Sequence, residues 1–351
     1  MERILVLEDG SFYKGEALGA DRFRIGELIF NTSMTGYQEI LTDSANAGKM
    51  IVMTYPLIGA YGINREDNES LKPSLFGLIV RTAADKPSNF RCEETLEAYL
   101  TRMGIPAIQG VDTRAIVRRL REKGTMRASF CNTEKEIPAL LKKIRTYVPE
   151  EHPVRTVSTR STYQVPGRKH KVVVMDFGVK QSTLRACADR GYDLIVVPYD
   201  TDAKTILEYH PEGILLSTGP GNPAGLSSAA ETVKELMTQT VVYGCGFGCE
   251  LIGLACGASL VRLPHGHHGP NQAVVDCSTG RVLITHQNHD YALDGESLKD
   301  TGLRLTHRSL NDESAEGICH TEYRVRGIEY DADEAFFNDF ESAMRGEDTH
   351  A

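Results

Sequence analysis

The sequence predicts an α+β domain followed by an α/β domain built on a doubly wound, mostly parallel sheet. After residue 171, short uninterrupted apolar runs alternate with helix-type patterns, as expected for strands that are buried on both faces. Before residue 145, strand and helix patterns occur without that regular alternation. A polar stretch broken by proline and glycine separates the two textures. We therefore expect domains at residues 1–150 and 171–346, joined by a linker at 151–170.

The first domain is expected to begin with a β-hairpin, because apolar runs flank the turn dipeptide Asp9-Gly10. Apolar runs that end at turn signals predict three more strands, at 28–32, 50–54 and 78–80. Amphipathic patterns predict helices at 93–103 and 114–123, and a weaker one at 135–147.

In the second domain, the expected strands are 172–175, 194–197, 214–216 and the run that begins at Val241, separated by helices at 180–190, 203–209 and 229–238. Parallel strands joined by helices place their carboxyl ends at one edge of the sheet. The loops 176–178 and 217–223 and the turn 244–248 should therefore meet there. Gly219 and Gly221 bracket a proline in the second loop, and backbone amides held in this way favour an oxyanion-type role.

The turn 244–248 has the strand–turn–helix pattern of a nucleophile elbow, in which glycines flank a central nucleophile. The central residue of such a turn is held in a strained conformation. Here the central residue is Gly246, so the turn keeps its shape and has no side-chain atom that could attack a substrate.

Composition limits the classes of partner. The 351 residues have a formal net charge of −9, which argues against a nucleic-acid-binding or anionic-membrane-binding surface. No apolar run is long enough to span a membrane, and the N-terminal one is too short for a signal peptide. Eight cysteines scattered over a long chain are typical of reduced thiols in the cytoplasm.

Several motifs together resemble one family. They are the segments 5–10, 30–43, 54–59, 88–91 and 110–114 in the first domain, and 176–178, 219–223, 266–269, 287–289 and 309–312 in the second. The chain resembles the small subunit of carbamoyl-phosphate synthetase, which joins its own N-terminal domain to a class I glutamine amidotransferase domain. The resemblance implies no cofactor. It implies pairing with a large synthetase subunit that makes carbamoyl phosphate for pyrimidine or arginine synthesis.

In that family a Cys–His–Glu triad hydrolyses glutamine, and here the resemblance fails at each triad position. Gly246 stands at the thiol position, and Asp331 and Asp333 stand where the family has histidine and glutamate. Acids around the pocket should repel one another and raise some of their pKa values if they converge. The resemblance assigns the former glutamine pocket to Ala45, Gly219, Gly221, Phe247, Glu250, Asn288, Asp290 and Tyr291.

Other cysteines, histidines and a lysine were weighed as functional groups. Cys245 is expected to point into the sheet core, whereas Cys249 begins a helix whose dipole would lower a thiol pKa, so Cys249 is the candidate reactive thiol. The cysteines at 245, 249 and 256 and the histidines at 265, 267 and 268 lack a matched second pair, so no metal site is predicted. His289 is expected to be a structural hydrogen-bonding residue, and Lys180 a solvated residue at a helix start.

The sequence leaves three functions open. The first is a pseudoenzyme: a small-subunit homologue that pairs with a large subunit, has lost glutamine hydrolysis and leaves the assembly to use free ammonia. The second is a glutaminase of altered mechanism that acts through Cys249. The third is a non-catalytic binding or regulatory protein that uses the acidic pocket for a cationic small molecule.

Overall fold

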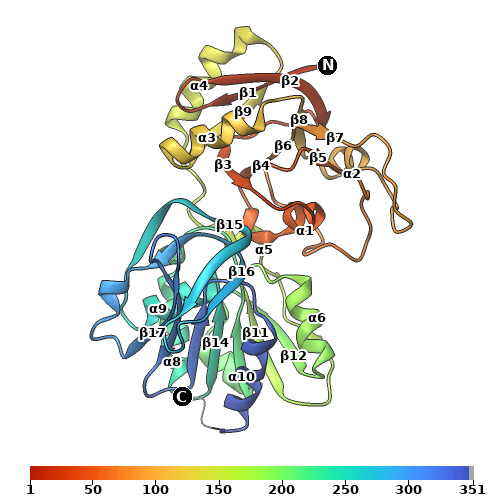
Figure 1. Ribbon diagram of the computed structural model, residues 1–351. Coiled ribbons are helices and arrows are strands. Elements are labelled where there is room, and N and C mark those ends of the chain that lie inside the picture. The colour runs from red at the N-terminus through yellow and green to blue at the C-terminus, as the bar shows by residue number, and fades with distance from the viewer. Residues whose placement is uncertain (348–351) are drawn as a thin grey trace. The chain divides into compact units, whose positions relative to one another are not determined.

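The computed structural model describes residues 1–347 (Figure 1). The chain divides into two compact units, Met1–Glu150 and Glu151–Ala351. Each unit has its own sheet and its own buried apolar clusters, and each is described separately below.

The first unit is built on a closed barrel whose strand order is β1-β2-β8-β6-β4-β3-β9. Antiparallel pairing of β1 with both β2 and β9 closes the barrel. Closure leaves the barrel without an exposed sheet edge. The strands are β1 (Glu2–Leu7), β2 (Phe12–Gly19), β3 (Gly26–Asn31), β4 (Lys49–Met53), β6 (Gly77–Ile79), β8 (Pro106–Gln109) and β9 (Met126–Cys131).

Four α-helices accompany the barrel. The helix predicted at 93–103 begins at residue 96 because the Thr95 hydroxyl caps it by accepting a bond from the amide of Ala98. Asp112 caps the next helix in the same way. The remaining elements include a short parallel pair and two 3₁₀ turns. The bounds are α1 (Tyr37–Thr42), α2 (Leu96–Met103), α3 (Thr113–Lys123), α4 (Ile137–Thr146), β5 (Leu57–Ile58), β7 (Thr82–Ala83), η1 (Ser44–Asn46) and η2 (Glu134–Glu136).

The second unit is built on a ten-stranded sheet of order β10-β12-β11-β13-β14-β19-β18-β17-β15-β16. The five strands β12, β11, β13, β14 and β19 run parallel, as predicted for an α/β domain. Antiparallel strands extend this parallel core on both sides, so the sheet is mixed. The bounds are β10 (Tyr163–Val165), β11 (Lys171–Asp176), β12 (Asp193–Pro198), β13 (Gly213–Leu216), β14 (Val241–Cys245), β15 (Leu260–Asp276), β16 (Val282–Leu293), β17 (Leu303–Ser309), β18 (Ala315–His320) and β19 (Val325–Ile328).

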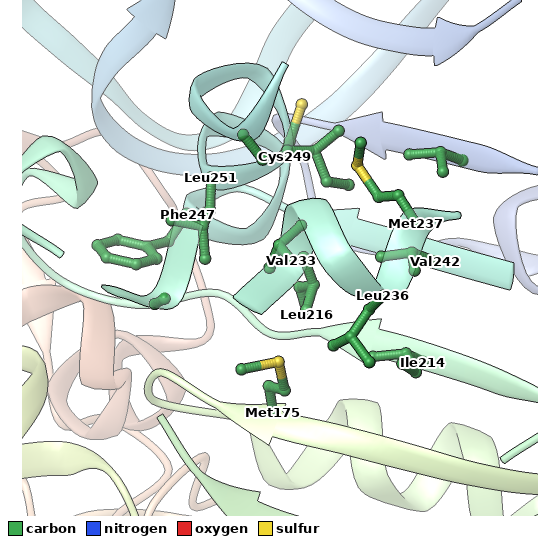
Figure 2. Close-up of a cluster of buried hydrophobic side chains, with 14 of the residues drawn as sticks. Met175, Ile214, Leu216, Val233, Leu236, Met237, Val242, Phe247, Cys249 and Leu251 are labelled. Carbon is green, nitrogen blue, oxygen red and sulfur yellow. The ribbon is translucent and has the colours of Figure 1, made fainter. Parts of the chain in front are cut away.

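Helices cover both faces of this sheet. One apolar cluster joins alternate strand residues to α7, α8 and α9, and part of it is drawn in Figure 2. The other cluster joins the intervening strand residues to α6 and α10. Strand residues of alternating parity enter opposite clusters because successive side chains of a strand point to opposite faces. The bounds are α6 (Gln181–Asp189), α7 (Ala203–Glu208), α8 (Ser227–Met237), α9 (Phe247–Ala255) and α10 (Glu334–Met344), with 3₁₀ turns η3 (Pro223–Gly225) and η4 (Gly295–Leu298).

The stretch expected to be a linker, 151–170, is more than a connection. It contains the short helix α5 (Val154–Val157), whose Val154 is fully buried in the core of the second unit. It also supplies β10, which pairs antiparallel with β12 at the sheet edge. A strand of three residues is too short to show a periodicity, which is why sequence patterning does not detect it.

Candidate functional site

The turn between β14 and α9 keeps the geometry of an elbow. Gly246 caps α9 with a φ of 51° and a ψ of −116°. This is the positive-φ region of the Ramachandran plot, which residues with a Cβ rarely adopt. Its amide donates to the carbonyl of Ile328 at 2.7 Å, and its carbonyl accepts from the amide of Cys249 at 2.8 Å. The sharp strand-to-helix turn is therefore present with glycine at its tip.

The neighbouring glycines are required by packing. A Cβ at Gly244 would lie 2.6 Å from the backbone of Gly248, and a Cβ at Gly248 would lie 2.4 Å from the carbonyl oxygen of Leu216. A Cβ at Gly246 would instead meet only Thr218, at 3.5 Å, which is ordinary van der Waals contact. The tip therefore has room for a side chain, and this chain places none there.

The predicted loops do meet at the carboxyl edge of the parallel strands. The Ser217 hydroxyl accepts a hydrogen bond from the amide of Phe177 at 2.9 Å, which ties the loop after β13 to the loop after β11. Gly219 packs so closely on Phe177 that a Cβ would lie 2.6 Å from its carbonyl oxygen. Gly221 has a φ of +87° and faces Pro153. A Cβ at Gly246 would lie 3.5 Å from Thr218, so this loop lies beside the elbow, as an oxyanion-type role would require.

Asp331, which the resemblance assigns to the histidine position of the triad, is held by two basic side chains. The Lys180 ammonium lies 2.7 Å from one carboxylate oxygen and 2.9 Å from the other, and His286 Nδ1 lies 2.8 Å from the second. Burial opposes ionisation of this carboxyl, but the charges and hydrogen bonds of Lys180 and His286 outweigh it and lower the pKa of Asp331. The interpretation of Lys180 as a solvated residue is wrong, because only 4% of it is exposed.

Three of the acids expected around the pocket, Asp290, Asp331 and Asp333, each have a different partner. Asp333 caps α10 by accepting from the amide of Phe336 at 2.8 Å. Asp290 lies 3.3 Å from His268 Nε2, and Asp331 is paired as described. A carboxylate oxygen of Glu250 lies within 4.8 Å of one on Glu329.

Of the residues assigned to the former glutamine pocket, several lie in the interior. Phe247 belongs to the apolar core and faces the ring of Phe177 at 5.2 Å between centroids. The Asn288 side-chain oxygen lies 2.8 Å from His268 Nδ1, and the Arg262 guanidinium lies over the ring of Tyr291 at 5.9 Å. Ala45 is buried in η1 of the first unit.

The candidate reactive thiol is deeply buried. Cys249 has no exposed surface and packs in the same cluster as Leu216 and Met237, as Figure 2 shows. Burial, with the carboxylate of Glu329 as the next cause, raises the pKa of Cys249 well above its usual value. The helix dipole expected to activate this thiol does not overcome these effects, and the geometry counts against Cys249 as a nucleophile. Cys245 is buried in the opposite cluster, as predicted.

A network of buried polar side chains lies on β15, β16 and β18. His267 is 2.9 Å from Asp312 and 3.0 Å from Glu316. Burial disfavours the charged imidazole, but these two carboxylates raise the pKa of His267 to about 9. Gln287 donates to Glu316 at 2.7 Å. His267 therefore lies between two carboxylates, each within ion-pair distance of its ring.

Sequence reasoning missed three side chains of this region. Lys180 was expected to be solvated and is buried instead. His286 was expected near the end of a strand and lies inside β16. Glu329 had no assigned role, although it stands between the apolar residues Ile328 and Tyr330 and is 2% exposed. A charged residue flanked by buried apolar ones is the signal that could have found it. The cysteines weighed as metal ligands belong to neither of the His/acid groups whose donor atoms cluster in the described residues.

Comparison with known families agrees with the division seen in the fold. A family model described as "Carbamoyl-phosphate synthase small chain, CPSase domain" matches residues 5–130, and one described as "Glutamine amidotransferase class-I" matches residues 173–330. The protein is therefore a class I glutamine amidotransferase domain preceded by a CPSase small-chain domain.

Curated relatives define the family more narrowly. Proteins named carbamoyl phosphate synthase small chain are similar to this chain in Fusobacterium nucleatum (44% identity, covering 93% of this chain and 92% of that one), in Bacillus caldolyticus (43%, 94% and 91%) and in Staphylococcus saprophyticus (43%, 94% and 90%). The chain belongs to the carbamoyl phosphate synthase small chain family. Among the described residues, no helix is both long enough and apolar enough to cross a bilayer.

Proposed function

We propose that this protein is a small chain that does not hydrolyse glutamine and that acts by pairing with a large carbamoyl-phosphate synthetase subunit in the cytoplasm. In this function the assembly takes free ammonia as its nitrogen donor. The protein contributes its folded surface to the complex, and it contributes no acyl-transfer chemistry. The pathway it serves is that of its family, pyrimidine or arginine synthesis.

The observation that supports this function most strongly is the pair of replacements at the elbow. Amide hydrolysis of this type needs a nucleophile and a base that can take its proton at neutral pH. Gly246 offers no nucleophile, and Asp331 is an ionised carboxylate engaged by Lys180 and His286. A base with a lowered pKa that is already paired with a cation is a poor proton acceptor.

The alternative of a glutaminase that acts through Cys249 finds no support in the geometry. Its thiol is buried on the core side of α9, and the fully buried residues Leu216 and Leu251 belong to the same apolar cluster. A thiol whose pKa is raised by burial has little thiolate at neutral pH. The alternative of a cationic ligand in an acidic pocket is weakened too, because Asp331 already has a lysine partner.

Reconstitution with the large subunit from the same source tests the proposal. Carbamoyl phosphate formation is measured with ammonia and with glutamine as the donor, for the large subunit alone and for the complex, and copurification reports pairing. We expect a stable complex, synthesis from ammonia, and no synthesis from glutamine above the large-subunit background. A thiol-bearing small chain from a relative serves as the positive control.

Two results would count against the proposal in different ways. Glutamine-dependent synthesis at a rate comparable to that with ammonia would refute the loss of hydrolysis. Failure to copurify, with both subunits folded, would refute the pairing and would leave the chemical argument at the elbow intact.

A further inference from the structure

Three buried side chains from separate elements bring oxygen and nitrogen atoms together beneath the elbow. Glu250 lies in the first turn of α9, His289 lies in β16, and Glu329 directly follows β19. One donor atom from each lies within 4.8 Å of the other two. The three residues are 2%, 6% and 2% exposed, respectively. We call them the Glu250–His289–Glu329 cluster.

Glu329 gives the first indication that a ligand belongs here. Within residues 1–347, no nitrogen or oxygen donor bonds to either carboxylate oxygen of Glu329, which faces the weakly donating thiol of Cys249. Burial, followed by the like charges of Glu250 and Glu316, raises the pKa of Glu329 well above its usual value. An unpaired buried carboxylate is costly, so this side chain needs either a proton or a cation.

His289 gives the second indication. Its Nδ1 lies 2.6 Å from the carbonyl oxygen of Tyr291, which fixes the proton on Nδ1 and leaves a lone pair on Nε2. A neutral imidazole whose Nδ1–H is held by a carbonyl, with Nε2 facing acids, has the arrangement of a metal-bound histidine.

The Nε2 atom of His289 faces another hydrogen-bond acceptor, an arrangement that a cation between the two would stabilise. Gln287 donates its amide hydrogens to Thr285 at 3.0 Å and to Glu316 at 2.7 Å, which fixes the orientation of its side chain. Its Oε1 then lies 3.2 Å from His289 Nε2, so two lone pairs face each other. A positive ion near both atoms would remove this repulsion.

A second group of donor atoms, His267, His289 and Glu316, shares His289 with the cluster. Both ring nitrogens of His267 already face carboxylates, since its Nε2 lies 2.9 Å from Asp312 and its Nδ1 lies 3.0 Å from Glu316. The Glu250–His289–Glu329 cluster is the better candidate of the two for a metal ion, because it contains the Glu329 carboxylate, which no nitrogen or oxygen donor reaches within the described residues.

We propose that Glu250, His289 and Glu329 bind one first-row divalent cation, with Zn²⁺ as the best fit. Two carboxylates and one imidazole suit zinc, whereas magnesium prefers an all-oxygen shell with several waters. Zinc donors at about 2.0–2.2 Å from the metal lie roughly 3.4 Å apart, so the cluster contracts slightly on binding. The ion would tie α9, β16 and the end of β19 together.

Metal analysis of the full-length protein tests the site. Every form has Cys277, which is exposed, replaced by serine, so that a surface thiol does not hold zinc. After chelation and gel filtration, the protein is titrated with Zn²⁺ against a competing indicator, and its melting temperature is measured with and without metal. We expect one equivalent to bind and the melting temperature to rise.

The matched variants are Glu329→Gln and Glu316→Gln, which make the same change in the two groups of donor atoms that share His289. Glu329→Gln should weaken zinc binding by more than about 100-fold, the upper end of what loss of an outer-shell partner costs. Glu316→Gln should keep one equivalent. Circular dichroism establishes that each variant folds, and Glu250→Gln replaces Glu329→Gln if the latter does not.

The results separate the metal from a shared proton. Absence of a bound equivalent in the parent protein would overturn the proposal and leave a proton on the carboxylate pair. Zinc that binds equally well to the parent and to Glu329→Gln would also overturn it, because the ion would then lie elsewhere.

Discussion

The strained tip of the elbow can be tested by adding a single methyl group. In Gly246→Ala, the new Cβ would lie 3.5 Å from Thr218 Cγ2, a normal contact, so no steric clash with the surroundings is expected. The cost should come from the backbone, because φ stays at about 51° and ψ at about −116° while β14 and α9 keep their places. The substitution therefore measures the conformational strain that glycine avoids.

The magnitude follows from two opposing effects. Holding a residue with a Cβ in such a sparsely populated region costs about 1–3 kcal/mol. Replacing glycine with alanine also restricts the unfolded chain, which returns about 0.4–1 kcal/mol. We expect a net loss of about 1–2 kcal/mol in the free energy of unfolding. For a unit of this size that corresponds to a fall of roughly 2–8 °C in the melting temperature.

Urea unfolding followed by circular dichroism gives the difference in unfolding free energy. Gly295→Ala is the control, because a Cβ there meets nothing within 4 Å and the backbone is not in the positive-φ region. The control should change stability by less than about 0.5 kcal/mol. If Gly246→Ala were as stable as Gly295→Ala, the elbow would have relaxed out of its strained form and the reasoning would be refuted.

Three more outcomes are expected. Gly246→Cys should restore a thiol without restoring glutaminase activity, since Asp331 is paired with Lys180 and cannot serve as the base; ammonia release from glutamine tests it, and a clear rise over the parent would contradict it. Asp331→Ala should cost about 2–3 kcal/mol in urea unfolding because it removes the carboxylate that lies 2.7 Å from the buried Lys180 ammonium, and Lys180→Met/Asp331→Leu should recover most of that loss. Asp9→Asn should cost about 1 kcal/mol at pH 7: burial opposes the charge of Asp9, but Ser11, Lys123 and Arg119 lower its pKa, so its stabilisation is present above about pH 4 and is lost as pH falls through the folded value. The gap between parent and Asp9→Asn should therefore close in acid unfolding curves below about pH 4.

The parallel half of the second sheet could be predicted because its strands are continuous apolar runs. The runs at 172–175, 194–197 and 214–216 correspond to β11, β12 and β13. The antiparallel strands were not predicted, since β15 contains proline, glycine and histidine and has register shifts between Arg262 and His267 and between Gly269 and Gln272. Such bulges break the alternation on which a strand prediction depends.

The first unit shows the same limit in another form. A hairpin at Asp9-Gly10 follows from local turn chemistry, and β1 and β2 confirm it. Closure of the barrel depends on β9 pairing with both β1 and β3, and β9 lies far along the chain from either. Long-range pairing of this kind leaves no local pattern, so the barrel did not follow from the sequence.

The candidate site divides along the same line. The glycine at 246, from which the proposed loss of a thiol is argued, is visible in the sequence because the flanking glycines fix the register of the motif. The ion pair of Lys180 with Asp331 joins residues 151 positions apart, so neither residue alone signals it. Cys249 was misjudged because a helix N-terminus is local and predictable, whereas the burial that raises its pKa depends on tertiary packing.

The packing around the glycines of the elbow explains why the turn keeps its shape without a nucleophile at its tip. A Cβ at Gly244 or Gly248 would lie 2.6 Å or less from neighbouring backbone atoms, whether or not the turn carries a nucleophile. The packing of the turn therefore requires glycine at both positions. The tip is the one position of the turn where the backbone disfavours a side chain while the surroundings permit one. Under the proposed function, glycine at 246 avoids strain of about 1–2 kcal/mol without disturbing the packing of α9 on β13. A chain that is stable without a nucleophile is what the proposed structural role beside a synthetase subunit requires.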